Sequence, residues 1–446
     1  MRVLKFGGTS IGDANQIKKV VNLISQGNSK IVVFSALSGI TNLLSEFVKQ
    51  VNFENYIVSE HIKLIIKERH LALSAELLHG TNFIKIAQKK ITESLDAISQ
   101  FTDQKIIGND VQFVLAQGEL LSAMIIHLYA LEQEIDTVYI PALNFMKLNE
   151  YREPDYDSIR TDLTNEINKY SNCNLIITNG FICLNHLGHI DNLGRGGSDF
   201  TATIIGNVLN SRVVEIWTDI DGLHNNDPRF VEHTIAIPNL SFDEAKELAY
   251  FGAKVLHPAS ITPAQNRNIP IILKNSFSPE DLGTVISEYT LNKELKAIAA
   301  KDDIITIKVK SGRMMQAFGF LRRIFEVFEK YQTSVDMLTT SEISVAMTID
   351  NSIHLNPIIE ELSELGETQV VKNQCIVSIV GDYTQNQNIS FQNIIDGLGD
   401  IPIKMISFGA SKINMSFVID SENKIEALNL LNKCILSNEP CLINKK

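Results

Sequence analysis

Apolar residues recur along residues 1–290 with two alternating spacings, one typical of strands and the other of helices. Residues 2–6 form a short apolar run that ends at a Gly-Gly pair, and Ile17, Val20, Val21 and Ile24 then follow at the spacing of one helix face. Further strands are predicted at 30–35, 136–140, 175–178, 213–218 and 269–274, and further helices at 43–51, 56–78, 83–101, 200–209 and 245–251. This alternation predicts a layered α/β domain.

The C-terminal third contains an internal repeat. Residues 343–350 (ISVAMTID) and 413–420 (INMSFVID) share their hydrophobic pattern and their final aspartate. Each copy follows a strand-like segment, at 334–339 or 403–407, and an amphipathic helix precedes that segment, at 320–328 or 391–398. The order predicts two small βαββ units of the ferredoxin-like kind. We therefore expect three regions, 1–290, 295–380 and 381–446, with 298–310 as a candidate for the first strand of the last one.

Composition limits the class of partner. The chain has 446 residues, of which 44% are hydrophobic and 21% charged, so it can bury more than one core. Its formal charge is -12, with 52 acidic against 40 basic residues. A surface of that sign repels phosphate backbones, so we expect no nucleic-acid partner. An anionic substrate must then be held by a local cluster of donors.

The cysteines and the N-terminus indicate the compartment. Five scattered cysteines include no C-x-x-C pair and no spacing that suits zinc, so reduced structural thiols and no metal site are expected. The cysteines are Cys173, Cys183, Cys375, Cys434 and Cys441. The first residues read as a strand rather than a signal peptide, and we find no apolar run of the roughly 18 residues that span a bilayer. A cytoplasmic protein without a membrane segment is predicted.

The first candidate for chemistry is Lys5-Phe6-Gly7-Gly8-Thr9-Ser10, at the end of the first predicted strand. Paired glycines let backbone N–H groups approach a phosphate, and the helix that follows favours negative charge at its start. Lys5 adds a mobile cation. The segment is not a P-loop, because G-x-x-x-x-G-K-[ST] does not occur in the chain. Taken alone, the same residues also suit a simple turn.

A second candidate is Gly194-Arg195-Gly196-Gly197-Ser198-Asp199, which precedes a helix-like stretch. Glycines around an arginine indicate a loop that wraps an anion, and Arg195 could grip a carboxylate with two hydrogen bonds. The alternative is that Ser198 or Asp199 caps the helix.

Three further segments carry polar residues at suggestive positions. Thr218 and Asp219 end a predicted strand and lead to Asp-Pro-Arg at 227–229, where a turn is the simpler interpretation. The segment FGAKVLHP at 251–258 contains a lysine that suits a phosphate or plain solvent. Glu119 follows a glycine that interrupts an apolar helix, so it is either a partly exposed helix residue or a receptor for an ammonium group.

Together these segments resemble the aspartokinase family. The resemblance rests on KFGGTS (5–10), SGITNLL (38–44), QGEL (117–120), GRGGSD (194–199), WTDIDG (217–222), DPR (227–229), FGAKVLHP (251–258) and SVDMLTTSEISV (334–345). These motifs are ordered and spaced over nearly the whole chain. The resemblance implies a three-layer αβα amino-acid-kinase fold, followed by two ferredoxin-like ACT domains that agree with the repeat.

The resemblance also implies the reaction and its residues. Enzymes of this family transfer the γ-phosphate of ATP, which binds with Mg²⁺, to the side-chain carboxylate of L-aspartate, the first step toward lysine, threonine and methionine. Lys5 would stabilise the transferring group and Asp199 would orient the catalytic lysines. Aspartate would be held by Thr41, Glu119, Arg195 and Ser198. The nucleotide would be contacted by Lys5, Phe6, Gly7, Gly8, Thr218, Asp219, His224, Arg229, Lys254 and Val255.

Regulation and assembly follow from the same resemblance. ACT domains in this family pair across subunits and bind end-product amino acids, which implies a homodimer or a dimer of dimers. The matching effector residues are Met314, Val335, Asp336, Ser341 and Glu342. Lysine is the expected inhibitor and threonine the second candidate. The loop 311–319 lacks the serine that lysine-responsive relatives often place near its end. Relatives also commonly show Tyr-Thr-Thr where this chain has His224-Asn225-Asn226.

Two other functions remain open at this stage. A kinase of the same fold could act on glutamate, acetylglutamate or a nucleotide, although Glu119, Arg195 and the ACT pair favour aspartate. A catalytically silent amino-acid sensor is the alternative from another class, although the presence of Lys5, Asp199 and Lys254 disfavours it.

Overall fold

The computed structural model describes two compact units. The described residues are 1–27, 29–101, 104–170, 173–252, 256–289, 295–314, 318–382 and 391–437. Unit 1 contains residues 1–223, 238–242 and 256–289, and unit 2 contains 224–237, 243–255 and 290–446. Unit 2 therefore includes two segments, 224–237 and 243–255, that lie inside the predicted catalytic region in the sequence.

Unit 1 is built on an eight-stranded sheet with the order β3-β4-β2-β1-β7-β9-β10-β8. Neighbouring strands from β3 to β9 are parallel, β10 is antiparallel to β9, and β8 is parallel to β10. The strands are β1 (Arg2–Phe6), β2 (Lys30–Phe34), β3 (Thr137–Tyr139), β4 (Leu175–Asn179), β7 (Val214–Thr218), β8 (Asn239–Ser241), β9 (Ile271–Asn275) and β10 (Thr284–Ser287). A small hairpin, β5 (Ile182–Leu184) and β6 (Ile190–Asn192), lies outside this sheet.

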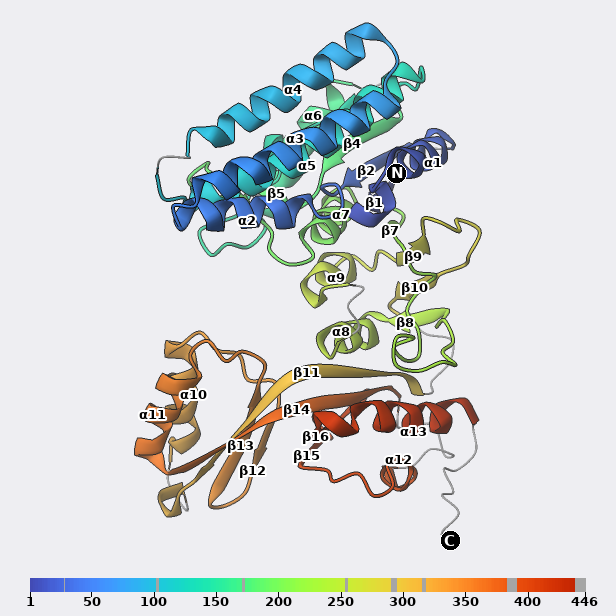
Figure 1. Cartoon of the computed structure of the whole chain (residues 1–446). Helices are drawn as coiled ribbons and strands as arrows, with labels where there is room; N and C mark the ends of the chain where they lie inside the picture. Colours follow the sequence, from blue (N-terminus) through green and yellow to red (C-terminus); the bar gives the residue numbers. More distant parts are fainter. Residues whose placement is uncertain are drawn as a thin grey trace. The chain divides into compact units, whose positions relative to one another are not determined.

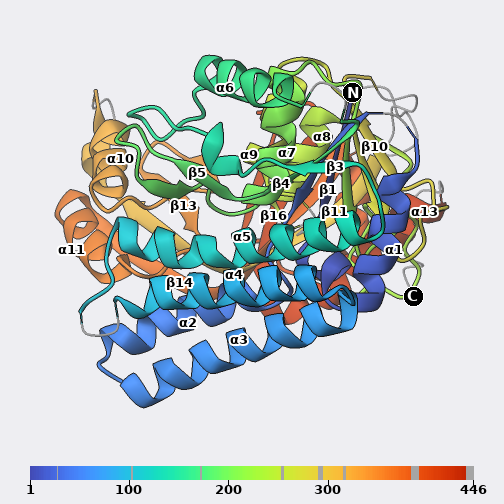
Figure 2. The same cartoon turned by 90° about the horizontal axis from the view of Figure 1, so that it is seen from above.

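Helices cover both faces of the sheet, as the apolar character of its central strands requires. Leu4, Phe6, Val32 and Phe34 pack into one core with α1 to α5, while α7 contacts β1, β2 and β7. Figure 2 shows the first group of helices on one side of the sheet and α6, α7 and α9 on the other. The helices are α1 (Ala14–Ser25), α2 (Ile40–Asn52), α3 (Tyr56–Leu77), α4 (Thr81–Ser99), α5 (Asn109–Glu132), α6 (Tyr156–Asn168), α7 (Gly197–Val208) and α9 (Pro258–Gln265). The predicted three-layer αβα fold is confirmed.

The helix α5 is the apolar centre of the helical layer. It is long and apolar enough to cross a membrane by length and composition, but 72% of that apolar window is buried inside the protein. Gly118 lets α5 approach α2 closely, because a Cβ at this position would lie 2.9 Å from the Ile40 side chain. The glycine that interrupts the apolar pattern is therefore explained by packing, and the helix continues through it.

Unit 2 contains a six-stranded antiparallel sheet with the order β12-β13-β11-β14-β16-β15. Its strands are β11 (Leu295–Lys310), β12 (Leu338–Thr340), β13 (Ser344–Ile349), β14 (Glu367–Gly381), β15 (Met405–Phe408) and β16 (Asn414–Asp420). Figure 1 shows α10 (Phe320–Lys330) and α11 (Leu355–Leu365) beside one end of β11 and β14, with α12 (Phe391–Gly397) and α13 (Lys424–Ser437) beside the other. Each pair of helices covers its own apolar core.

The long strands β11 and β14 belong to both halves of this sheet. Residues 305–310 of β11 pair with β13 on one side and with the start of β14 on the other. Residues 295–301 pair with the end of β14, which in turn pairs with β16. Each half therefore contains four strands and two helices, which confirms the predicted pair of ferredoxin-like units. The boundary at residues 380 and 381 stays a prediction, and β14 runs through it without a break.

Several predicted elements differ in extent from those observed, and two of these differences have a clear physical cause. The strand predicted at 334–339 appears as the shorter β12, because Asp336 N–H and Met337 C=O both bond to Thr348, whose hydroxyl also accepts from Met337 N–H. This doubled pairing with one residue interrupts the regular ladder. The helix predicted at 200–209 begins at Gly197, because Gly196 adopts φ 70° and starts the first turn.

Candidate functional site

The candidate site of unit 1 lies at the carboxyl ends of parallel strands. β1 pairs with β2 on one side and with β7 on the other, so the strand order reverses at β1. Such reversal points leave a crevice at the carboxyl edge of a sheet, where α/β proteins bind ligands. Lys5 lies near the end of β1, Thr218 ends β7, and Gly7 N–H donates to the Trp217 carbonyl at 3.2 Å.

The glycine pair after β1 is needed for close backbone packing. A Cβ at Gly8 would lie 2.8 Å from the Ala36 carbonyl oxygen and 3.2 Å from Ser38 N. The backbone after β1 therefore runs directly against the segment after β2. The short helical turn Gly8–Ile11 follows. Lys5 Nζ lies beside the first glycine of the pair, 3.5 Å from where a Cβ at Gly7 would be. This arrangement suits a phosphate, as the sequence predicted.

Lys5 and Asp199 form an ion pair at the centre of this edge. Lys5 Nζ lies 2.6 Å from Asp199 Oδ1, and each side chain is 11% exposed. Asp199 is in the first turn of α7, which begins at Gly197 directly after the left-handed Gly196. Neither Ser198 nor Asp199 caps that helix, because no side chain bonds to its N-terminal amides. The capping interpretation is therefore wrong, and both residues are buried at the site instead.

Glu119 is a buried carboxyl group beside the same lysine. Its residue is 4% exposed, and Oε2 has no hydrogen-bond partner among the described residues. Burial raises the pKa of Glu119 to about 8, although Lys5 and the Ala36 amide both act in the opposite direction. A carboxyl group with an unused oxygen in a dry site is suited to accept a donor from a ligand. The alternative of a partly exposed helix residue is wrong.

Arg195 and Thr41 lie at more open positions. Arg195 is exposed and has no ion pair with any described residue. The partial burial of His257, and then the charge of Arg195, lower the pKa of His257. Its guanidinium group is thus available for an anion. Thr41 is half-buried at the start of α2, and the neighbouring Ile40 is the residue that Gly118 approaches.

The end of β7 is joined to the neighbouring strands by hydroxyl groups. Thr218 donates to Asp219 Oδ1 at 3.0 Å, and Ser276 donates to the Thr218 carbonyl at 2.9 Å. Ser276 also bonds to Ser10, which follows the glycine pair, at 2.8 Å. The structure therefore brings the end of β7 next to the segment after β1.

The other predicted nucleotide residues do not belong to this unit. His224 and Arg229 lie in unit 2, where the His224 ring bonds to Thr234 and Arg229 pairs with Asp227. Lys254 and Val255 lie outside the described residues.

The predicted effector residues fall into three environments within unit 2. Met314 and Val335 pack against the core beneath α10 and α11. Ser341 and Glu342 are exposed in the turn between β12 and β13. Asp336 has a side chain only 1% exposed, so it is not an ordinary surface carboxylate.

Asp336 is already engaged by two donors. Lys301 Nζ lies 2.8 Å from Asp336 Oδ1, and the Tyr250 hydroxyl donates to the same atom at 2.6 Å. Asp336 Oδ2 is buried without a partner among the described residues, so one oxygen of the group is available to a ligand.

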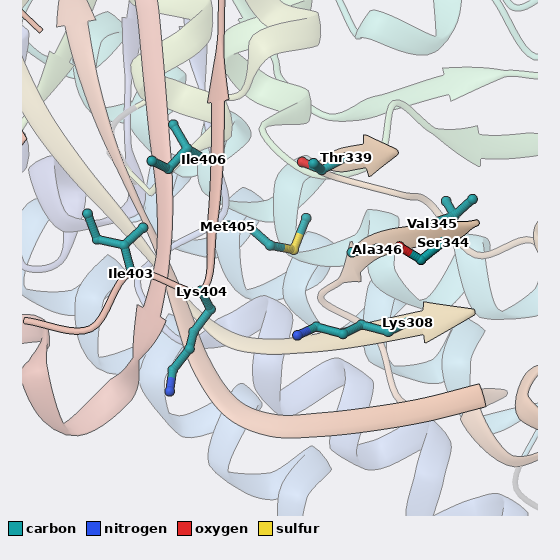
Figure 3. Close-up of a pocket in the computed structure, with 9 residues that line it drawn as sticks. All are labelled: Lys308, Thr339, Ser344, Val345, Ala346, Ile403, Lys404, Met405 and Ile406. Atoms are coloured by element: carbon teal, nitrogen blue, oxygen red, sulfur yellow. The ribbon is translucent and has the colours of Figure 1, made fainter. Parts of the chain in front are cut away.

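A separate hollow of about 510 Å³ lies between β11, β13 and the start of β15. Figure 3 shows the Lys308 side chain extending across it toward the β15 side. Lys308 and Lys404 supply its cations, with apolar side chains around them. None of the predicted effector residues lines this hollow.

Sequence reasoning missed Asn179 at the end of β4. Its amide donates to the Glu119 carbonyl at 2.7 Å, and its oxygen accepts from the Tyr139 hydroxyl at 2.9 Å. Asn179 thereby fixes α5 beside the sheet at the position of Glu119. The signal available in the sequence was an Asn-Gly pair directly after a buried strand.

Comparisons with known proteins agree with this geometry. Residues 1–275 match the amino acid kinase family, and residues 377–434 match the ACT domain. Aspartokinase 1 from the chloroplast of Arabidopsis thaliana is 32% identical over 96% of this chain and 79% of its own length. The lysine-sensitive aspartokinase 3 of Escherichia coli is 30% identical over 94% of this chain and 96% of its own.

Solved structures give the same result. E. coli aspartokinase III in complex with aspartate and ADP, in the R-state, superposes with a TM-score of 0.83 at 29% identity, covering 98% of this chain and 99% of that one. The same protein in complex with lysine and aspartate, in the T-state, gives 0.78, with the same identity and coverage. This chain therefore belongs to the aspartokinase family and is an enzyme of that family.

Proposed function

We propose that the chain transfers the γ-phosphate of ATP to the side-chain carboxylate of L-aspartate and forms 4-phospho-L-aspartate, the first step toward lysine, threonine and methionine. The observation that carries the proposal is the buried Lys5–Asp199 pair, 2.6 Å apart, near Glu119, whose Oε2 has no hydrogen-bond partner among the described residues. This edge of the sheet offers a cation for a phosphoryl group and an acceptor for an ammonium group. An amino acid with a second carboxylate can place its ammonium group at Glu119 and, at the same time, its side-chain carboxylate near the phosphoryl group that Lys5 binds.

The reaction needs positioning more than proton transfer. The side chain of aspartate has a reference pKa of about 3.9, so the nucleophile is already ionised at neutral pH. The site must bring two anions into line and stabilise charge that moves toward ADP. Lys5 and the amides after Gly7 supply that stabilisation, while Asp199 holds the Lys5 ammonium in place.

We propose that Mg²⁺ enters with ATP. No group of three His, Cys, Asp or Glu side chains suited to a metal occurs among the described residues. Mg²⁺ commonly takes one or two carboxylates together with phosphate oxygens and water, and Asp199 is the carboxylate at the phosphate end of this site. When bound, the ion would neutralise part of the phosphate charge.

The substrate and nucleotide contacts follow the family motifs. Glu119 accepts the α-ammonium group of aspartate, Arg195 binds its α-carboxylate, and Thr41 and Ser198 complete the site. Thr218, Asp219, His224, Arg229, Lys254 and Val255 line the nucleotide.

Lysine is the proposed inhibitor, and threonine the second candidate. The relative from E. coli is lysine-sensitive and has been solved with lysine bound. In this chain, the unused Oδ2 of Asp336 offers an acceptor for an ammonium group. We also propose a cytoplasmic homodimer or dimer of dimers, joined through the ferredoxin-like units, whose sheet ends in the edge strands β12 and β15.

The substrate can be identified by trapping the product. With ATP, Mg²⁺ and hydroxylamine, the protein should form a hydroxamate from aspartate, because hydroxylamine attacks an acyl phosphate. Glutamate, acetylglutamate and a nucleotide offered singly should give none. A hydroxamate from another acid, or none from aspartate, would overturn the proposal.

Lys5→Ala should lower kcat by roughly 10²–10³, the scale of one preorganised electrostatic donor. Arg195→Ala should instead raise the KM for aspartate, because its partner is a carboxylate that does not react. Steady-state kinetics check both, with Lys18→Ala on the exposed face of α1 as the control and thermal unfolding to verify folding. An unchanged kcat in Lys5→Ala would remove Lys5 from the mechanism.

Aspartate binding should release protons and tighten with rising pH. Because the pKa of Glu119 is raised to about 8, the free enzyme holds this group mostly neutral at pH 7, and an ammonium group must drive its ionisation. The Kd for aspartate should fall by roughly tenfold or more between pH 6 and pH 8. Calorimetry in buffers of different ionisation enthalpy measures the protons released.

Glu119→Gln is the matched variant for this pH effect, since it keeps the shape and removes the titration. Its Kd for aspartate should be higher and nearly independent of pH over the same range. Binding by the unmodified protein that releases no proton at pH 7 would contradict the role given to Glu119.

Millimolar lysine should inhibit the enzyme and raise its Tm, because a ligand that binds the folded state stabilises it by mass action. Glu342→Gln should weaken both effects, whereas Glu364→Gln, on the exposed face of α11, should not. If lysine leaves activity and Tm unchanged while threonine alters them, threonine takes its place. If neither amino acid acts, the effector proposal fails and the kinase proposal stands.

A further inference from the structure

Three buried asparagines join the segment 224–237 to the C-terminal helix. Asn225 is 4% exposed, and Asn226 and Asn432 are each 3% exposed. Asn225 and Asn226 stand where relatives commonly have Thr-Thr, directly before Asp-Pro-Arg, and Asn432 is on α13. All three belong to unit 2.

Asn432 is the centre of the cluster. Its Oδ1 accepts from Asn225 Nδ2 at 3.2 Å and from Asn226 Nδ2 at 3.4 Å, while its own Nδ2 donates to the His233 carbonyl at 2.9 Å. The Asn432 side chain therefore bonds to the segment 224–237 near its start, at Asn225 and Asn226, and near its end, at His233. Asn226 Nδ2 also donates to the Leu428 carbonyl on α13 at 3.1 Å.

The other atoms of the two loop asparagines shape the segment itself. Asn225 Oδ1 accepts from Ile235 N–H at 2.7 Å, and its backbone carbonyl accepts from Ile298 N–H on β11 at 2.8 Å. Asn226 Oδ1 accepts from Asp227 N–H at 2.9 Å, at the start of the turn that carries Arg229. The segment is thus bonded to both a strand and a helix of unit 2.

The turn after the cluster is fixed in the same direct way. Asp227 accepts from the backbone N–H of Arg229 and from its guanidinium group, each at 2.9 Å. Val231 is buried in the apolar core beneath α12 and α13. The position of the Arg229 side chain is therefore set by contacts that begin at Asn226 and end in that core.

We infer that Asn432 is a positioning residue for the nucleotide: through Asn225 and Asn226 it holds the turn that presents Arg229. The inference rests on the proposed function, in which Arg229 contacts ATP.

The test compares the two substrates of the same enzyme. Asn432→Leu removes the central acceptor and donor at similar volume, so the KM for ATP should rise about tenfold while kcat and the KM for aspartate change less than about twofold. Asn226→Ser should act in the same direction. In the double variant, the KM for ATP should rise by less than the product of the two single increases, because both substitutions disrupt the same hydrogen-bond network. Lys433→Ala, at the exposed neighbouring position of α13, is the control.

Arg229→Ala distinguishes failure of the inference from failure of the proposed site. If Arg229→Ala raises the KM for ATP but Asn432→Leu and Asn226→Ser only lower Tm, the cluster is merely structural and the inference is wrong. Equal increases in both KM values would also refute it. If Arg229→Ala leaves the KM for ATP unchanged, the turn does not contact ATP, and both the inference and this part of the proposed site fall. Should Asn432→Leu fail to fold, Asn226→Ser decides between these outcomes.

Discussion

The close pair of Lys5 and Asp199 is the interaction on which the candidate site of unit 1 depends. A lysine removed from water is costly unless an anion lies beside it, and Asp199 is brought there by the first turn of α7. The left-handed Gly196 immediately precedes that turn, and Lys5 near the end of β1 reaches the Asp199 carboxylate. The glycines at both ends of the site therefore serve the same ion pair from opposite sides.

The sequence was sufficient where the physical cause was local. Helix periodicity located α1 to α4 and α10 within a few residues, and short buried runs located β1, β2, β4, β7 and β9. Lys5, Asp199 and Glu119 could also be found from the sequence, because each lies within two positions of a glycine in a recognisable motif. Their mutual contact came from the resemblance rather than from spacing.

Other features could not be read from local pattern. The division of β11 and β14 between two halves of one sheet depends on pairing between residues about 60 to 80 positions apart, as in Ile298 with Ile379 and Lys308 with Gln369. The capping expectation at Ser198 failed because a left-handed glycine can start a helix without a side-chain acceptor. The engagement of Asp336 by Lys301 and Tyr250 brings together three distant segments, and sequence alone gives no sign of it.

The two shared strands make the six-stranded sheet of unit 2 indivisible. Residues 295–301 supply an outer strand to the half that contains α12 and α13, so this strand is synthesised well before the other strands of that half. Because β11 and β14 run through both halves, neither half can unfold without disrupting the sheet of the other, and the two should unfold together in one cooperative transition. During synthesis on the ribosome, that strand must wait for more than 70 further residues before its neighbour exists, which leaves an apolar edge open until translation is nearly finished.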